Sequence, residues 1–355
     1  MNAPAKPHVT KRILIFVGIG LAALVLYLYY LGTVNVAAEI EKTNLLLYAS
    51  AFVAFLASVT FYSIAWQGML RNLHIKIRTR QALVYAWAGM FFDAIVPDPG
   101  WSGDLSKAYM LSKASGQEAG GIVASVVGQK IIIMAVTIVD LLLGLVLLGL
   151  NYALPSNVLV FITAVLLLTV SALLVLVYLS THESATGKLL NWLVRVACFI
   201  RRGHWDPQDF RAKAERTLNR FHEGIRTLTA NPKALVQPVA FSLLSWALDI
   251  SITFLAFASL GYPVAVDKVL IVYALTGSLQ AMGASFLGFT EIIVSGSYAI
   301  LGIPAAISVS ATLLIRVVTL WFKLVVSYFV FQWAGIGLLL GKTQEAVEPK
   351  KFNVN

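Results

Sequence analysis

Charged side chains are scarce in this sequence. Asp, Glu, Lys and Arg make up 12% of its 355 residues, whereas soluble domains carry about 25%. Hydrophobic residues make up 59%, and the mean hydropathy is +0.80. A chain with so little charge cannot cover a water-facing surface. The composition therefore predicts an all-α polytopic membrane protein and excludes a soluble enzyme.

Acidic residues are the scarcer of the two signs, which leaves a formal net charge of +10. In a soluble protein this excess would point to nucleic acid. Here the basic residues lie in short stretches between apolar runs, where the positive-inside rule places them. We therefore expect no nucleic-acid partner.

Several groups that carry chemistry are also missing. The single Cys198 excludes an internal disulfide and any multi-cysteine metal site. All five histidines lie outside the apolar runs, and no metal-ligand spacing appears. The chain has no Gly-x-x-x-x-Gly-Lys-Ser/Thr loop for nucleotide phosphates. We therefore expect no metal, no cofactor and no ATP hydrolysis within this chain.

Six apolar runs are present that each reach the length of about 20 residues needed to span a bilayer. They are residues 13–31, 44–66, 119–149, 156–180, 235–260 and 304–337. The first run follows Lys6, Lys11 and Arg12, as a signal peptide would, but it is long enough to span and no small-residue cleavage site follows it. We interpret it as an uncleaved helix, and residues 1–355 as a single membrane domain.

Two further apolar regions, 81–113 and 269–303, are interrupted. The first is broken at Pro97-Asp98-Pro99-Gly100 and again at Gly103-Asp104, and the second around Gly288. Unpaired backbone groups cost several kcal/mol each in hydrocarbon, so such breaks must be surrounded by protein or by a wet cavity. We therefore predict two re-entrant helical hairpins, with turns made by Pro97, Gly100, Gly103 and Gly288.

The loop charges predict the orientation. Lys and Arg gather in segments 67–80 and 181–234 and in the tail, whereas segments 32–43, 150–155 and 261–268 carry few. The positive-inside rule then places both termini in the cytoplasm, in a protein of the cell membrane. Counting either hairpin as a full crossing would move later basic loops to the wrong side.

The segment 181–234 is predicted to be a basic, amphipathic cytoplasmic segment. Within it, apolar residues recur at helical spacing between 208 and 230. We expect a helix that lies on anionic headgroups, with a partner-binding helix as the alternative.

The two halves of the chain, 44–149 and 235–337, follow one pattern. Asp104 precedes Lys130 by 26 residues, and Glu291 precedes Arg316 by 25. The first hairpin opens from the inside and the second from the outside, which makes an inverted repeat. Such repeats are typical of transporters, whose broken helices meet at the substrate site. Chance likeness between two apolar segments is the alternative.

Ionisable side chains within spans cost about 2.5–3.5 kcal/mol each and therefore indicate partners or ligands. Those beside the breaks, with their matched bases, are the candidate substrate-binding residues Asp98, Asp104, Lys107, Lys130, Glu291, Arg316 and, one helix face further on, Lys323. Arg316 suits a phosphate as a bidentate fork and Lys130 as a point charge. Asp104 and Glu291 would hold the bases in an empty site, or bind a cation or proton. For Asp140 and Asp249 we expect structural pairing.

These residues resemble the flippase-like family that includes the transmembrane domain of lysylphosphatidylglycerol synthase. The resemblance rests on Pro97-Asp-Pro-Gly-Trp-Ser-Gly103-Asp104-Leu-Ser-Lys107 with Gln129-Lys130, and on Gly288-Phe-Thr-Glu291 with Leu314-Ile-Arg316. It covers roughly residues 10–340. Ser102 stands where the family usually has glycine, and lysines stand at 107 and 130 in place of arginines.

The resemblance implies that a lipid headgroup moves between leaflets. The expected partners are membrane lipids, either an anionic phospholipid or a polyprenyl phosphate, together with a lipid-modifying enzyme. The soluble aminoacyl-transferase domain of the synthase has no counterpart here, so we do not expect an enzyme. An intramembrane enzyme acting on lipid-linked phosphate or sugar remains an alternative, as does a cation-coupled transporter of small solutes.

Overall fold

The long apolar runs form helices in the computed structural model, which describes Tyr29 and residues 33–96, 100–151, 156–200, 207–281 and 288–339. Five helical stretches are long and apolar enough to cross a membrane, and they match five of the six predicted spans. The sixth, 13–31, lies outside the described residues. All regular structure in the described residues is helical, which confirms the predicted class of polytopic α-helical membrane protein.

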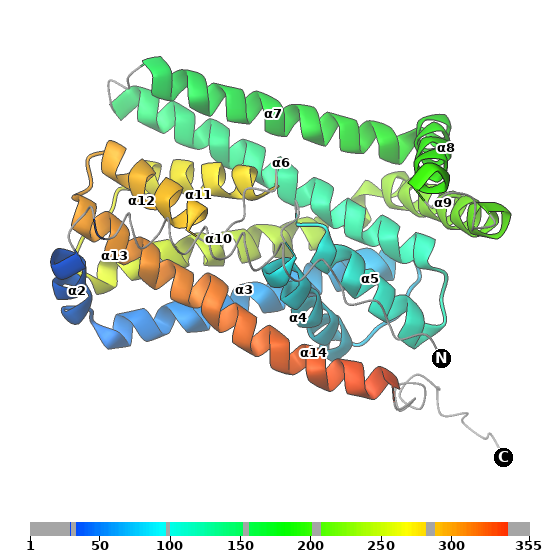
Figure 1. Ribbon diagram of the computed structural model, residues 1–355, viewed down its shortest axis with the longest axis horizontal. Helices are drawn as coiled ribbons and strands as arrows, with labels where there is room; N and C mark the ends of the chain where they lie inside the picture. Colours follow the sequence, from blue (N-terminus) through cyan, green and yellow to red (C-terminus); the bar gives the residue numbers. More distant parts are fainter. Residues whose placement is uncertain are drawn as a thin grey trace.

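The elements follow one another with short connections (Figure 1). They are α2 (Thr33–Glu41), α3 (Leu45–Asn72), α4 (Thr79–Ile95), α5 (Ser102–Ser115), α6 (Ala119–Asn151), α7 (Ser156–Thr181), α8 (Glu183–Ile200), α9 (Pro207–Ala230), the 3₁₀ turn η1 (Pro232–Leu235), α10 (Val236–Ser259), α11 (Val266–Ala281), α12 (Phe289–Ile300), α13 (Ala305–Arg316), the π-helix η2 (Val317–Phe322) and α14 (Lys323–Leu339).

The outer face of the bundle is apolar. On α7, Val160, Leu167 and Leu174 are each more than half exposed. Large aliphatic side chains exposed in this number along a long helix would be unfavourable in water but suit contact with lipid tails. The same sequence run therefore explains both the length of the helix and the surface that it presents.

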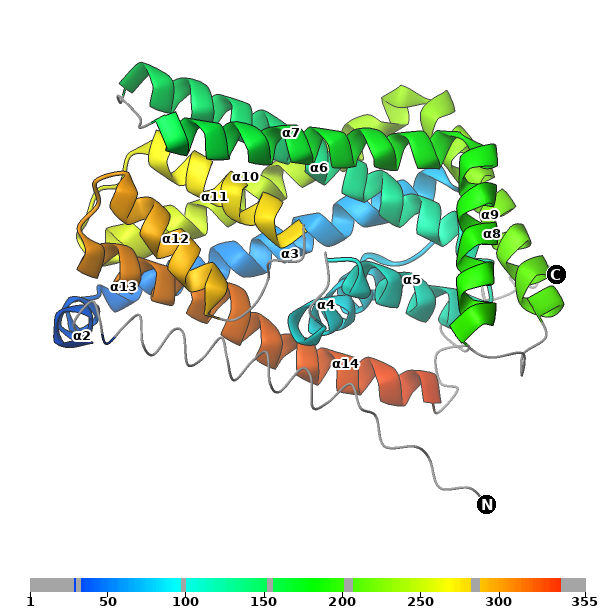
Figure 2. The same ribbon diagram turned by 45° about the horizontal axis from the view of Figure 1, so that its top comes forward.

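The two predicted hairpins are present and lie at opposite ends of the bundle (Figures 1 and 2). Helices α4 and α5 occupy the half towards α8 and α9, which we call the α9 end. Helices α11 and α12 occupy the half towards α2, which we call the α2 end. In both hairpins the helices turn back near the middle of the bundle, so each breaks at mid-length, as the glycine and proline positions predict.

Helices of each half of the chain pack against helices of the other half. Helix α3 of the first half packs along α10 of the second, while α4 packs against α14 and α11 against α6. In the last two pairs, the first arm of one hairpin lies on the last long helix of the other half. This reciprocal pattern agrees with an inverted repeat, and it ties each hairpin to the other half of the chain.

The central pair, α3 and α10, is fastened at both of its ends. At the α2 end, Asn44 caps α3 by accepting from the backbone N–H of Leu46 at 3.1 Å and of Leu47 at 3.2 Å. Its own N–H donates to the Ser259 carbonyl at 2.7 Å. At the α9 end, the Asn72 amide donates to the Ala234 carbonyl at 2.7 Å. These bonds fix the register of the two helices that support both hairpins.

Helix α9 is amphipathic, as predicted, but its apolar side contacts protein. Phe221, Ile225 and Leu228 are buried, and α9 packs along α6. Close approach is possible because Gly120 and Gly224 lie in the contact, where a Cβ atom would meet the neighbouring helix. The expectation that this face rests on lipid headgroups is therefore wrong, since small residues on α6 offer it a closer partner.

Candidate functional site

The first charged cluster surrounds Asp104, in the first turn of α5. Its Oδ1 accepts from the Lys107 ammonium at 2.8 Å and from the Tyr62 hydroxyl at 3.2 Å. Its Oδ2 lies 3.2 Å from the Lys130 ammonium. One buried carboxylate thus holds two lysines, and its place at a helix N-terminus adds favourable dipole interaction. The predicted pairing of Asp104 with Lys130 is confirmed.

Lys107 is enclosed, with 1% of its surface exposed. Its ammonium also donates to the Tyr62 hydroxyl at 2.7 Å and to Gln129 Oε1 at 3.1 Å. These bonds, with Asp104, use the three donors of the ammonium. The rings of Tyr62 and Trp66 lie 4.6 and 5.1 Å from it. Lys107 is therefore a fixed counter-charge, and a ligand would have to displace existing bonds to reach it.

Lys130 is the more accessible lysine of this cluster. Its side chain is 17% exposed, and its ammonium donates to the Gly100 carbonyl at 2.7 Å while it lies 5.2 Å from the centre of the Trp101 ring. Gly100 has a φ of 73°, so the backbone turns there in a conformation that favours glycine. The break in the first hairpin thus positions Lys130 directly through a main-chain carbonyl.

Asp93 of α4 fastens the two arms of the first hairpin. Its Oδ1 accepts from the Gly103 N–H at 2.7 Å and from the Ser102 hydroxyl at 3.2 Å. A Cβ at Gly103 would collide with the Asp93 carboxylate and with the Gly89 carbonyl. The prediction that Gly103 makes the hairpin turn is wrong. It lies within α5, and glycine is needed there for close helix packing.

The second cluster is a pair at the start of α12. Glu291 Oε1 accepts from Arg316 Nε at 2.5 Å, and its Oε2 accepts from the Gly288 N–H at 2.6 Å. Gly288 has a φ of 87°, which explains the glycine at this break. The predicted acid–base pair is confirmed. Within the described part of the chain, Nε is the one Arg316 nitrogen with a hydrogen bond, and no described residue bonds its two terminal nitrogens.

Lys323 lies between the two clusters. It follows the π-helix η2, which separates it from Arg316. It is partly buried and interacts electrostatically with Asp93, Asp249 and Arg316. No ion pair within 4.0 Å joins it to another described residue. A π-helix is rare and often marks a functional site, and here it places a cation between an acid of the first half and the arginine of the second.

The structure describes only some of the remaining predicted residues. Pro97 and Asp98 lie outside the described residues. Tryptophan near the end of a span commonly lies at the membrane interface. Trp66 does not, because it is fully buried and donates to the Ser125 hydroxyl at 3.0 Å. Trp333 is exposed, as an interface residue would be. No group of three or more His, Cys, Asp or Glu side chains in the described ranges is placed to hold a metal ion.

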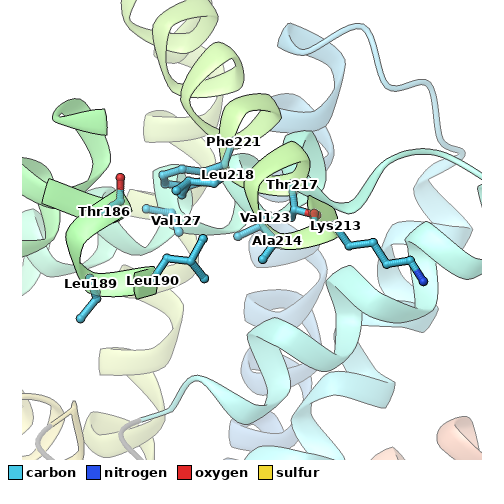
Figure 3. Close-up of a pocket in the computed structure, with 10 residues that line it drawn as sticks. All are labelled: Val123, Val127, Thr186, Leu189, Leu190, Lys213, Ala214, Thr217, Leu218 and Phe221. Atoms are coloured by element: carbon cyan, nitrogen blue, oxygen red, sulfur yellow. The ribbon is translucent and has the colours of Figure 1, made fainter. Parts of the chain in front are cut away.

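A separate cavity of about 570 Å³ lies between α6, α8 and α9 (Figure 3). Its lining is mainly apolar and consists of Val123, Val127, Thr186, Leu189, Leu190, Lys213, Ala214, Thr217, Leu218 and Phe221. The Lys213 ammonium points away from the leucines (Figure 3). This cavity is at the α9 end and apart from the hairpin clusters, so it does not contribute to the charged site.

Buried ion pairs at the breaks of two opposed hairpins, within a bundle of membrane-crossing helices, define a polytopic membrane protein with a polar centre. The family described as the lysylphosphatidylglycerol synthase TM region matches residues 13–327. The chain belongs to that family, which confirms the resemblance seen in its motifs and indicates a lipid-related membrane function.

Curated relatives cover nearly the whole chain. A UPF0104 membrane protein of Pyrococcus horikoshii is 21% identical over 88% of this chain and 93% of its own length. A UPF0104 membrane protein of Methanothermobacter thermautotrophicus is 22% identical over 86% of this chain and 91% of its own length. A UPF0104 membrane protein of Methanocaldococcus jannaschii is 20% identical over 91% of this chain and 95% of its own length. No solved structure matches the chain at a significant level.

Proposed function

We propose that this protein is a lipid translocase that moves a phosphate-containing lipid, or a polyprenyl-phosphate-linked headgroup, between the leaflets. One observation carries the proposal. Asp104–Lys130 and Glu291–Arg316 are buried ion pairs on hairpins that enter the bundle from opposite ends and break near its middle. Ionisable side chains at mid-depth in a membrane are costly and commonly mark a functional site. Two ion pairs related by an inverted repeat are typical of a transport site.

The chemistry of the pairs favours a phosphate. Arg316 bonds Glu291 through Nε, which leaves its two terminal nitrogens for phosphate oxygens in the fork geometry that guanidinium provides. Lys130 is held by Asp104 and by a carbonyl, and phosphate oxygens can replace these bonds. The carboxylates thus keep the bases in place in the empty site; Asp104 gives up Lys130 when the headgroup enters, while Glu291 can stay on Arg316.

The lipid tails need no site within the bundle. The outer face is apolar, as on α7, so the tails remain in the bilayer while the headgroup crosses between the hairpins. Rocking of one half against the other, about the contact of α3 with α10, would expose the site to each side in turn. On this proposal the basic α9 end faces the cytoplasm of the cell, in agreement with the positive-inside rule.

Reconstitution in liposomes tests the proposal. Protein would be incorporated with a fluorescent phospholipid or a labelled polyprenyl phosphate, and the labelled lipid in the outer leaflet would be measured over time by chemical quenching. We expect transfer by the wild type, and loss of at least nine-tenths of it in Arg316→Ala. Arg226→Ala is the matched control, because Arg226 is 76% exposed and pairs with Glu183 on the surface.

The outcomes separate the candidate functions. Normal transfer by Arg316→Ala would contradict the role of Arg316. A wild type that moves neither lipid would contradict the proposal as a whole. Mass spectrometry of the lipids after the assay should find them chemically unchanged, and a new lipid product would favour an intramembrane enzyme instead.

A further inference from the structure

Asp140 is a buried carboxyl that the phosphate site does not use. It lies on α6 with 1% of its surface exposed. The Trp246 indole N–H donates to its Oδ2 at 3.3 Å, while its Oδ1 has no hydrogen-bond partner in the described structure. No Lys, Arg or His of the described residues lies within 4.0 Å. The structural ion pair expected for Asp140 is therefore not found among them.

An ionised carboxylate in this position would be strongly unfavourable. A charge buried in a low-dielectric interior needs a counter-charge or several hydrogen bonds, and Asp140 has one hydrogen bond from a neutral donor. Binding a single proton removes the charge. The geometry therefore suits a group that is neutral while it is enclosed and ionises when water reaches it.

The helices around Asp140 supply few charges. Helix α10 contributes Asp249 and α11 contributes Tyr273, and Tyr273 interacts with both carboxyls. Helix α7 has no charged residue, and the charged residue of α3 is Arg71, near its α9 end. Helices α5 and α9 contact α6 nearer its start, since Lys130 pairs with α5 there. Ten residues separate Lys130 from Asp140, or about 15 Å of helix.

A line of interacting groups connects Asp140 with the phosphate site. Tyr273 interacts with Asp140 and Asp249. Asp249 interacts with Lys323, and Lys323 interacts in turn with Arg316. Each of these groups therefore senses the charge of the next, and a change of charge at Asp140 shifts the electrostatic balance towards the base that we assign to the lipid phosphate.

Unpaired hydroxyls occur on the same helices. The side-chain oxygens of Ser242 on α10 and Ser278 on α11 are buried and, like Asp140 Oδ1, lack a hydrogen bond within the described residues. Helices α6, α10 and α11 pack against one another. Ser242 is one helical turn before Trp246, the residue that bonds Asp140. These three helices thus carry several buried polar atoms that no described residue bonds.

We propose that Asp140 is a proton-carrying carboxyl that couples lipid translocation to the movement of protons across the membrane. This inference rests on the proposed translocase function. In each cycle one proton passes from water to a carboxylate oxygen of Asp140 and later leaves to water on the other side. One O–H bond forms and the same bond breaks. Protonation neutralises Asp140 and allows the α6–α10–α11 interface to close, and deprotonation favours its opening.

Two measurements on the full-length protein test the proposal. Infrared difference spectroscopy across a pH titration should show the C=O stretch of a protonated carboxyl that is absent from Asp140→Asn. The liposome assay should show a several-fold change in the initial rate of lipid transfer when a pH gradient is imposed. Asp140→Asn should transfer lipid more slowly, at a rate that the gradient no longer changes.

Asp267→Asn is the matched control. Asp267 is also buried on α11, at the α2 end, where the Asn151 amide donates to it at 3.2 Å. This variant should keep the response to the gradient. Asp249→Asn is a second test variant, in which we expect a reduced response because Asp249 connects Asp140 with Lys323.

The results distinguish this inference from the proposed function. Transfer by the wild type that ignores the gradient, or an Asp140→Asn protein that still responds to it, overturns the coupling role and leaves the translocase intact. The absence of a carboxyl band assigned to Asp140 also overturns it. A wild type that moves no lipid, even though Asp140 titrates, overturns the translocase and the coupling together.

Discussion

The two hairpins carry the same acid-to-base spacing but surround it differently. In the first, Asp104 bonds two lysines and a tyrosine, and Gln129 completes the network. In the second, Glu291 bonds one arginine and a backbone N–H. The first cluster is thus a closed network held by three helices, while the second is a simple pair with nitrogens to spare. The comparison suggests that the first half fixes the geometry and that the second offers the ligand its remaining donors.

The choice of base in each half fits this division. A lysine ammonium is a compact charge with three donors, and those of Lys107 are all used. An arginine guanidinium has five donors in a plane, and Arg316 uses one of them within the described residues. Arginine can therefore hold its carboxylate and a phosphate together, whereas Lys107 cannot gain a ligand without losing a bond.

The largest effect is expected from Asp104→Asn. This change leaves Lys107 and Lys130 buried without their common counter-charge, and removing one partner of a buried pair costs about 3–5 kcal/mol. The free energy of unfolding in detergent, measured with denaturant, should fall by that amount. A loss below about 1 kcal/mol would contradict the view that Asp104 is the centre of a structural network.

Glu291→Gln should have a smaller effect on stability. The amide oxygen can still accept from the Gly288 N–H, and one base loses its partner instead of two. A lost hydrogen bond to a charged group costs about 1.5–3 kcal/mol. The same denaturation assay measures it, and a double-mutant cycle with Arg316→Gln isolates the pair. A loss larger than that of Asp104→Asn would reverse the proposed division of roles.

Gly103→Ala tests the close packing of the first hairpin. In the described part of the second, a Cβ at Gly277 or Gly296 would meet nothing within 4 Å. The added methyl group meets the Asp93 carboxylate and the Gly89 carbonyl, and overpacking of this kind costs about 1–3 kcal/mol. Gly149→Ala is the matched control, since a Cβ there meets nothing within 4 Å. Thermal unfolding measures the stability of both variants. Equal melting temperatures would show that α4 and α5 can move apart freely.

The smallest effect is expected at an exposed pair, which calibrates the buried ones. Arg220 of α9 bonds Glu118 at 2.5 Å and Glu223 at 2.8 Å on the surface. Solvent and salt screen such pairs. Arg220→Ala should therefore change the melting temperature less than Gly103→Ala does, and the difference from wild type should vanish in high salt. A fall in melting temperature that does not depend on salt would show that this pair is shielded from solvent as the buried clusters are.

Much of this architecture could be predicted from the sequence. Glycine, proline and charge inside apolar runs indicated where the helices break, because such residues are costly in lipid unless they have a structural reason. The spacings of 26 and 25 residues then identified Asp104 with Lys130 and Glu291 with Arg316, and both pairs are present.

The partners contributed by distant helices could not be predicted. Tyr62 and Gln129 are ordinary residues in apolar runs, and no local pattern tells which helix each will face. Asp93 bonds the N-terminus of a different helix, which depends on how α4 and α5 pack. The seating of α9 on α6 was missed for a similar reason, because Gly120 and Gly224 indicate a close contact only once the two helices are known to be neighbours.

The π-helix η2 has a consequence for helical phase. In an α-helix, residues seven apart lie two turns apart on nearly the same side, so Arg316 and Lys323 would point to one neighbour. The wider turns of η2 alter that rotation. Arg316 therefore meets α12, while Lys323 interacts with Asp93 of α4 and Asp249 of α10. Through one extra-wide segment, a single continuous helix presents a positive charge to each half of the repeat.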